Sequence, residues 1–250
     1  MISQGELLTP KKRYKRGYPV ATLVGLEEET AVLWKVFSNI VKHESTLHIN
    51  GARTNPKDLY NFHASIINAL RPTLKEGVRS IILASPPRTN HSQEFINHVS
   101  EHHKWLTQGS NKAAFSKITG SASTKSQVAA LTKAPLFSQT ISETTAEETE
   151  NLIEILEKRL NASDKNNLVL FSLEEAENLI LKRHQPGRPK PDYLMLTDRY
   201  LAGNRQTNRL HRLMQIAANK KVKTRIVDAD SPAGMRLTQL GGFICLAQLV

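Results

Sequence analysis

Cysteine, aromatic residues and long apolar runs are all scarce in this chain of 250 residues. The one cysteine, Cys245, excludes an internal disulfide and any metal cluster held by several thiolates. Cys245 lies in an apolar run, so we interpret it as a small core residue. No apolar run approaches the roughly 20 residues that a membrane helix needs, and residues 1–10 lack the apolar stretch of a signal peptide. These absences predict a cytoplasmic protein.

Acidic residues are also few relative to basic ones. The chain has 34 Lys and Arg residues against 23 Asp and Glu residues, a formal net charge of +11. The basic residues cluster in segments 11–16 and 199–225, and the second of these contains no acidic residue. Such clusters favour a polyanionic partner. Neither segment has a wide apolar face of its own, so nucleic acid is favoured over a membrane surface.

The first half of the chain predicts a basic arm followed by a mixed domain. Residues 1–17 are rich in charge and poor in apolar residues, which is typical of a disordered arm. Residues 18–139 follow as the first domain. Its predicted strands cover 20–24, 31–37, 45–49, 78–84 and 113–118, and its predicted helices cover 55–70, a segment around 95–99 and 126–132. We expect Pro72 to end or kink the first of these helices.

The second half, residues 140–250, alternates helices and strands. An acidic helix is expected over 143–160, with Thr145 and Glu148 as a capping box at its start. The predicted strands are 168–171, 193–197, 222–228 and 243–249, and the predicted helices are 173–182, 203–219 and 232–240. The connections are short, so we predict an α/β sandwich with helices on both faces of its sheet. The fold class predicted for the whole chain is α/β, in two domains.

Two groups of residues are candidates for RNA contact. In the predicted helix 203–219, Arg205, Arg209 and Arg212 fall on a different stripe from the apolar residues, and no acid in that segment pairs with them. Unopposed arginines suit contacts with phosphate. The arm combines cations with one aromatic ring that could stack on an unpaired base; its candidates are Lys11, Lys12, Arg13, Tyr14, Lys15 and Arg16.

Motifs for catalysis or metal binding are absent or incomplete. His98 and His102 lie one helical turn apart beside His103, but no third ligand with suitable spacing follows. We interpret these histidines as a polar helix face near RNA. No nucleophile elbow and no phosphate-binding glycine loop occurs. We therefore predict no catalytic residue, no bound metal and no cofactor.

Two parts of the chain resemble a known family. Residues 193–201 read YLMLTDRYL, and residues 222–250 contain a strand, a turn from Ser231 to Gly234, a helix and a closing apolar strand. This arrangement resembles the third domain of Pelota and of archaeal and eukaryotic class-1 release factors. In the middle of the chain, VRSIILASP (78–86) and GSASTKS (120–126) resemble segments of the second Pelota domain.

The resemblance, which spans about 18–250, implies a fold and a set of partners. It implies a ribonuclease H-like middle domain followed by an α/β/α sandwich like that of the kink-turn-binding ribosomal proteins. The implied function is binding to the ribosome in rescue, recycling or hibernation. The implied partners are rRNA, tRNA, an elongation-factor-like GTPase and a ribosome-splitting ATPase. No membrane partner is expected.

Departures from the family pattern leave alternatives open. The codon-reading N-terminal domain has no counterpart, and residues 50–56, which match the Gly-Gly-Gln loop of release factors, contain no Gln. Arg53 of this loop is a further candidate for ribosome contact. Pro87 and Arg88 stand where Pelota has Gly and Phe, so the GTPase partner stays open. The alternative functions are a peptidyl-tRNA hydrolase acting on stalled large subunits and a stand-alone binder of structured RNA.

Overall fold

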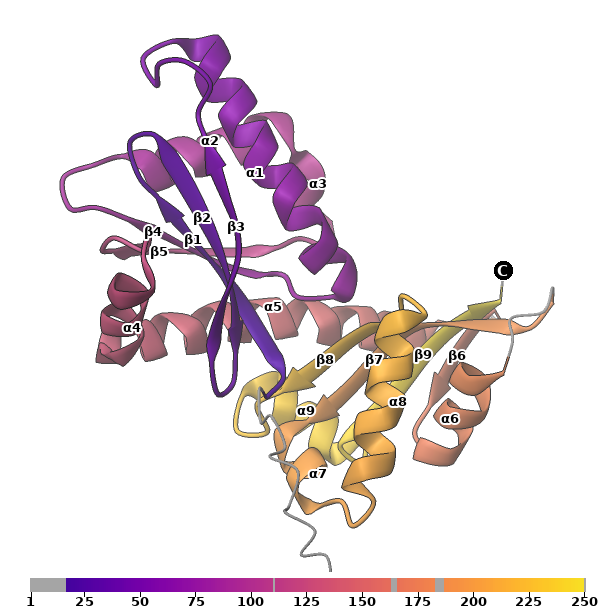
Figure 1. Cartoon of the computed structure of the whole chain (residues 1–250). Coiled ribbons are helices and arrows are strands. Elements are labelled where there is room, and N and C mark those ends of the chain that lie inside the picture. Colours follow the sequence, from indigo (N-terminus) through magenta and orange to yellow (C-terminus); the bar gives the residue numbers. More distant parts are fainter. Residues whose placement is uncertain (1–16, 110, 163–165, 183–186, 250) are drawn as a thin grey trace, which may run out of the picture.

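The computed structural model describes residues 17–109, 111–162, 166–182 and 187–249, and within them the chain forms two sheets. Figure 1 shows these sheets in two lobes that a long helix, α5 (Pro135–Asn161), connects. The first lobe is residues 17–134 and the second is residues 166–249. The α/β fold class is confirmed. No helix in the described ranges has both the length and the apolar character needed to cross a membrane.

The first lobe is built on a five-stranded mixed sheet of order β3-β2-β1-β4-β5. β1, β2 and β3 pair antiparallel, whereas β1, β4 and β5 pair parallel. The strands are β1 (Pro19–Leu26), β2 (Thr30–Phe37), β3 (Val41–His48), β4 (Ser80–Ser85) and β5 (Ala114–Thr119). The helices are α1 (Pro56–Glu76), α2 (His91–His102), α3 (Lys104–Thr107) and α4 (Lys125–Lys133).

Helices cover both faces of this sheet. On one face Val24 packs with Phe62 of α1 and Phe95 of α2. On the other face its neighbour Leu23 packs with Val128 of α4 and Phe137 of α5. Successive residues of β1 are therefore buried on opposite sides, which explains why its sequence is apolar except for Thr22.

α1 is longer than the sequence pattern predicted. The helix continues through Pro72 to Glu76, because Thr73 and Leu74 after the proline are buried against the lobe. It ends at Gly77, whose φ of 101° and N–H bond to Leu74 O form a left-handed cap. Of the two expected effects of Pro72, ending the helix is therefore wrong.

The second lobe is built on a four-stranded sheet of order β6-β9-β7-β8. β7 and β8 are parallel, and β9 runs antiparallel to both of its neighbours. The strands are β6 (Asn167–Leu170), β7 (Pro189–Thr197), β8 (Lys223–Val227) and β9 (Phe243–Leu249). The helices are α6 (Leu173–Leu181), α7 (Asp198–Gly203), α8 (Thr207–Asn219) and α9 (Pro232–Gln239). α6 and α8 pack on one face, and α5 and α9 pack on the other.

The predicted helix 203–219 is in fact a turn followed by a helix. α7 ends at Gly203, and the side chain of Asn204 accepts a hydrogen bond from Gln206 N at 2.8 Å. This Asx turn offers the backbone an alternative to a continuous helix. Arg205 therefore lies in the turn before α8.

α5 begins earlier than predicted and crosses the expected domain boundary. Pro135 occupies the first turn, where a missing N–H is tolerated, and Phe137, Thr140 and Thr144 are buried. The capping box is therefore wrong: Thr145 lies inside the helix, where its hydroxyl donates to Ile141 O at 2.8 Å. α5 packs against β4 and β5 of the first lobe and against α9 and β6 of the second.

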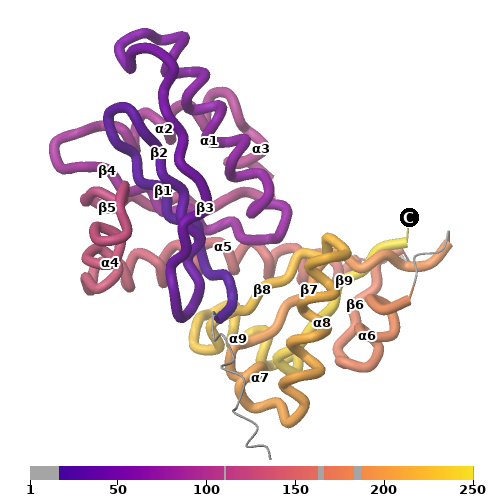
Figure 2. The backbone as a smooth tube through the Cα atoms, viewed as in Figure 1, coloured from indigo at the N-terminus to yellow at the C-terminus, as the bar shows by residue number. Residues whose placement is uncertain are grey.

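A buried ion pair lies where the two lobes meet, and we call it the lobe junction. Arg225 of β8 pairs with Glu148 of α5, and each side chain is only 2% exposed. The guanidinium also donates to Pro19 O and Val20 O of β1, each at 3.0 Å. Ser80 Oγ and the N–H of Arg79 donate to the Glu148 carboxylate. Figure 2 shows the start of β1 reaching the second lobe at this point.

Candidate nucleic-acid interface

The predicted basic arm joins the described chain beside the second lobe. Its candidate residues Lys11, Lys12, Arg13, Tyr14, Lys15 and Arg16 lie outside the described residues. Tyr18, two residues later, packs against the core of the second lobe. Burial, together with the carboxylates of Asp198 and Asp228, raises the pKa of the Tyr18 hydroxyl. Residue 17, where the predicted arm ends, is thus held near the start of α7.

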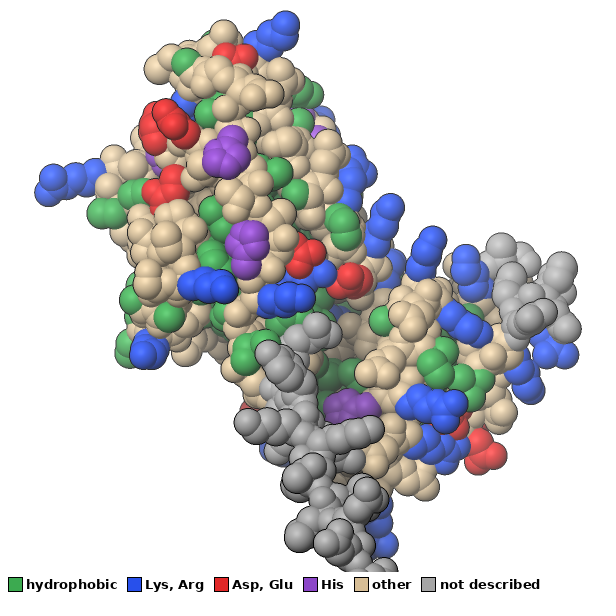
Figure 3. Space-filling model, in the orientation of Figure 1, with side chains coloured by type: hydrophobic (Ala, Val, Ile, Leu, Met, Phe, Trp, Pro, Cys, Tyr) green, Lys and Arg blue, Asp and Glu red, His purple; other side chains and the backbone are tan. Residues whose placement is uncertain are grey.

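Two arginines and a histidine at the start of α8 are exposed. Arg205 lies in the preceding turn, and His211 and Arg212 lie on the helix. No hydrogen bond or ion pair joins Arg205 or Arg212 to another described residue. We call Arg205, Arg209, His211 and Arg212 the α8 surface. Figure 3 shows Lys and Arg side chains spread over the part of the second lobe that carries α8.

Arg209 differs from the other two arginines because it has an acidic partner. Its Nε donates to Glu177 Oε2 at 2.8 Å, and its Nη1 donates to Gln206 Oε1 at 2.7 Å. The hydrogen bond from Arg209 lowers the pKa of the Glu177 carboxyl. The expectation that no acid pairs with these arginines is wrong for Arg209, because Glu177 comes from α6, about 30 residues earlier in the chain.

Other basic residues of segment 199–225 have structural roles. Lys220 Nζ donates to the carbonyls at the end of α6, at 2.6 Å for Ile180 O. Lys223 Nζ donates to the hydroxyl of Tyr193 at 2.9 Å, and Arg225 is buried in the lobe junction. Within this segment, Arg205, Arg212 and Lys221 remain as exposed cations whose side chains form no ion pair with another described residue.

Arg53 holds its loop to the body of the first lobe. Its side chain is only 8% exposed, and its Nη2 lies 2.9 Å from Glu94 Oε2 of α2. Nη1 donates to Glu27 O, in the turn between β1 and β2, at 3.1 Å. Burial raises the pKa of the Glu94 carboxyl, but the hydrogen bonds and the charge of Arg53 outweigh burial, and the net shift is downward. In this geometry the guanidinium of Arg53 is occupied within the chain.

The histidines noticed in the sequence belong to a larger aromatic cluster. The ring of His98 lies 5.0 Å from those of His63, Tyr60 and His102, and 5.2 Å from that of His103. Burial is the main cause that lowers the pKa of His63 and of His98 to about 4. Neutral imidazoles that contact one another edge-on are packing groups. Among the described residues, no three His, Cys, Asp or Glu side chains are placed to hold a metal ion.

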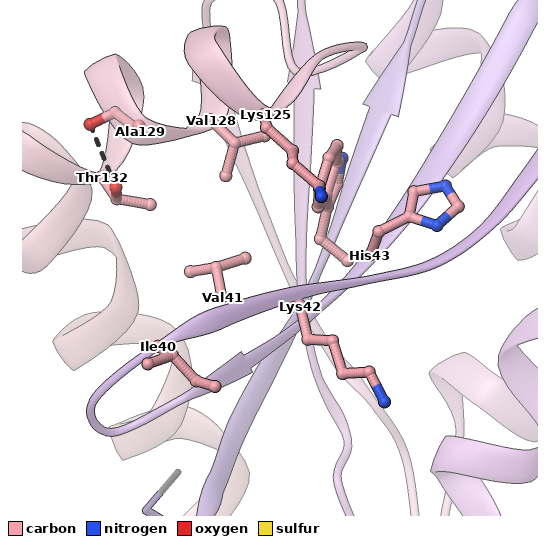
Figure 4. Close-up of a pocket in the computed structure, with 9 residues that line it drawn as sticks. Ile40, Val41, Lys42, His43, Lys125, Val128, Ala129 and Thr132 are labelled. Carbon is pink, nitrogen blue, oxygen red and sulfur yellow. Dashed lines mark hydrogen bonds between the residues drawn. The ribbon is translucent and has the colours of Figure 1, made fainter. Parts of the chain in front are cut away.

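A groove of about 900 Å³ lies between the β2–β3 hairpin and α4. Val41 and Val128 point toward one another across it, and Lys42 points the other way (Figure 4). Lys125 and His43 also line it, and no Asp, Glu, Cys or Ser side chain does so. The groove could hold an apolar group beside a cation.

Comparison with known proteins shows a likeness in structure. No protein-family model matches the chain, and no curated protein matches it. Archaeal Pelota, in a model of Pelota and ABCE1 bound to the ribosome, aligns with 96% of this chain and 64% of its own, at 16% identity and a TM-score of 0.51. This chain has a Pelota-like fold. The resemblance predicted from the sequence is confirmed at the level of the fold.

Two further Pelota-type structures align over a similar extent. Saccharomyces cerevisiae Dom34 is 19% identical over 91% of this chain and 62% of its own, with a TM-score of 0.47. It is described as a translation termination-like factor that functions in RNA quality control and interacts with Hbs1. Archaeoglobus fulgidus Pelota is 17% identical over 94% and 66%, with a TM-score of 0.39. The chain thus spans about two thirds or less of the length of these Pelota-type proteins.

Proposed function

We propose that this chain is a ribosome-associated translation factor of the Pelota type that acts by binding in ribosome rescue, recycling or hibernation. The observation that carries the proposal is the fold shared with archaeal Pelota across both lobes. That protein is known in a ribosome-bound state, and Dom34 is a translation termination-like factor. Together they support a ribosomal site of action for this chain.

The distribution of charge supports RNA as the surface that this factor contacts. Arg205 and Arg212 of the α8 surface form no hydrogen bond or ion pair with another described residue, and Tyr18, just after the predicted arm, packs against the core of the same lobe. Cations of this kind release counterions from a phosphate backbone, which is the main sequence-independent source of affinity for nucleic acid. We propose that the arm and the α8 surface contact rRNA, with tRNA as the alternative RNA partner.

Binding rather than bond cleavage is the proposed mode of action. A catalytic loop must place a water beside the ester of peptidyl-tRNA with preorganised donors. In loop 50–56, Arg53 is committed to Glu94, and the side chain of Asn55 accepts a hydrogen bond from Lys57 N at the start of α1. These commitments argue against a catalytic role for the loop. Peptidyl-tRNA hydrolysis is the alternative function, and an assay of peptide release would detect it.

Protein partners are proposed by analogy with the related structures. Dom34 interacts with Hbs1, and archaeal Pelota is found with ABCE1 on the ribosome. An elongation-factor-like GTPase or a ribosome-splitting ATPase is the corresponding partner proposed for this chain. Co-purification with each purified candidate, with and without ribosomes, tests this part of the proposal.

The test of the RNA surface is co-sedimentation of the full chain with purified ribosomes over a range of salt concentrations. Arg205→Glu with Arg212→Glu should weaken binding at least tenfold and reduce the slope of log affinity against log salt by about 2. Lys133→Glu with Lys158→Glu is the matched control, because it reverses two exposed cations outside the α8 surface. Equal effects of the two double variants would show that net charge, and not this surface, determines binding.

A further inference from the structure

Two large aromatic side chains are exposed on the helical layer of the first lobe. Tyr60 of α1 is 45% exposed and Trp105 of α3 is 42% exposed. In contrast, the second tryptophan, Trp34, is only 3% exposed, and its Nε1 donates to Ala122 O at 2.7 Å. The apolar rings of Tyr60 and Trp105 are therefore available to a partner.

Cationic and imidazole groups connect the two rings into a continuous surface. The Tyr60 ring lies 5.0 Å from that of His102. The guanidinium of Arg71 lies over Trp105, 5.2 Å from the ring centroid, and its Nε donates to Asn68 Oδ1. His103 follows His102 in the chain, and its ring lies 5.2 Å from that of His98. Burial and then the charges of Arg71 and His102 lower the pKa of its imidazole. We call Tyr60, Arg71, His102, His103 and Trp105 the aromatic stripe.

The geometry of α1 aligns this stripe along one direction. Eleven residues separate Tyr60 from Arg71, which is about three helical turns, so both lie on the same helix face about 16 Å apart. That length accommodates several stacked bases at about 3.4 Å each. The rings are also held in place, because Tyr60 contacts His98 and His102 edge-on and Trp105 contacts Arg71.

The charges around the stripe favour an anionic partner. Lys57, one turn before Tyr60, and Lys104, next to Trp105, are exposed, and neither forms an ion pair with another described residue. Of the nearby acids, Asp58 accepts a hydrogen bond from Ala52 N. Glu101 is 74% exposed, and its Oε2 lies 3.6 Å from His102 Nε2, a contact that becomes an ion pair when this imidazole is protonated. Exposed rings interleaved with unpaired cations suit a nucleic acid better than an apolar peptide.

We propose that the aromatic stripe binds unpaired nucleotides of RNA, with bases stacking on Tyr60 and Trp105 and phosphates pairing with Arg71 and the flanking lysines. Proteins bind single strands by this combination of rings and cations. The inference deepens the proposed function, on which it rests for the choice of RNA. It adds a second contact on the first lobe, formed by residues other than those of the α8 surface.

The fluorescence of Trp105 offers a direct test. The chain has two tryptophans, and the other is buried, so an oligoribonucleotide that stacks on the surface should quench mainly Trp105. Titration of the full chain with a single-stranded ten-nucleotide RNA should give saturable quenching that Trp105→Leu abolishes. Tyr60→Ala and Trp105→Ala should each weaken binding, measured by anisotropy of a labelled RNA, about tenfold.

Two further variants separate stacking from loss of structure. Tyr60→Phe retains the ring and should bind RNA as the original chain does, and Phe171→Ala removes an equally exposed aromatic of the second lobe and should leave affinity unchanged. RNA that binds without quenching Trp105, or alanine variants that bind normally, would overturn the proposal, as would no RNA binding at all. A chain that co-sediments with ribosomes but shows no quenching would refute only the stripe. Quenching without co-sedimentation would refute only the ribosomal function.

Discussion

Replacing Glu148 by Ala should destabilise the whole chain, because it leaves Arg225 buried without its carboxylate. Both side chains of the pair are 2% exposed, so solvent offers the orphaned guanidinium little compensation. Breaking a buried ion pair by removing one partner costs about 3–5 kcal/mol. The hydroxyl of Ser80 and the N–H of Arg79 lose an acceptor in the same variant, which adds to this cost.

The expected loss is large enough to measure by thermal unfolding. For a chain of this size, 1 kcal/mol shifts the Tm by about 2–4 °C, so a loss of about 4 kcal/mol lowers the Tm by about 8–16 °C. The matched control is Arg199→Ala, which removes an Arg from an exposed ion pair with Asp230, 2.8 Å from Nη2 to Oδ1. The control should shift the Tm by no more than about 3 °C.

A double substitution tests whether the uncompensated charge is the cause. Glu148→Leu with Arg225→Met removes both charges and should recover part of the stability lost in Glu148→Ala, although Pro19 O and Val20 O then lose their donor. A Glu148→Ala variant that melts like the Arg199→Ala control would refute the account of the lobe junction. Equal melting of the single and double variants would show that the loss comes from packing instead.

Three further predictions follow from the buried and paired groups. The pKa of His63 and of His98 in the folded chain is about 4, below the ordinary 6.5. Their neutral forms therefore contribute stability that is present above pH 6.5 and lost as the pH falls toward 4, up to about 3 kcal/mol for His63. His63→Gln should flatten this part of the curve of stability against pH, and an unchanged curve would contradict the prediction. Burial raises the pKa of the Cys245 thiol to about 12, so a thiol reagent at pH 8 should label the unfolded chain and not the folded one, whereas rapid labelling of the folded chain would refute its burial. Arg53→Ala should lower the Tm, because losing the contact with Glu94 destabilises the chain by about 1 kcal/mol. Neither the original chain nor the Arg53→Ala variant should release peptide from peptidyl-tRNA.

The alternation of elements was predictable from the sequence because it depends on local apolar spacing. Each predicted strand corresponds to a strand of the structure, and the two-sided burial of β1 agrees with its mostly apolar sequence. The start of α5 was not predictable in this way. Thr145 and Glu148 match a capping box, but burial of Phe137, Thr140 and Thr144 against the first lobe extends the helix toward its N-terminus and places Glu148 in the core.

The candidate site was harder to predict because its electrostatics depend on contacts between distant segments. Arg209 lies 32 residues from Glu177, and Arg53 lies 41 residues from Glu94. Nothing in the local sequence shows that Arg209, and not Arg205 or Arg212, forms an ion pair with an acidic residue from another part of the chain. The common face of Tyr60 and Arg71 was not predictable either, because the helix predicted over 55–70 ends before Arg71, whereas α1 continues to Glu76.

Sucrose-gradient sedimentation of the full chain with ribosomes is the most direct test of the central proposal. At low salt the chain should migrate with ribosomal particles, and it should return to the top of the gradient as salt rises, because phosphate contacts dominate its affinity. Particles prepared with and without puromycin would show whether a nascent peptide affects the interaction. A chain that stays at the top of the gradient at low salt, while its thermal melt shows that it is folded, would contradict the proposal that it binds the ribosome.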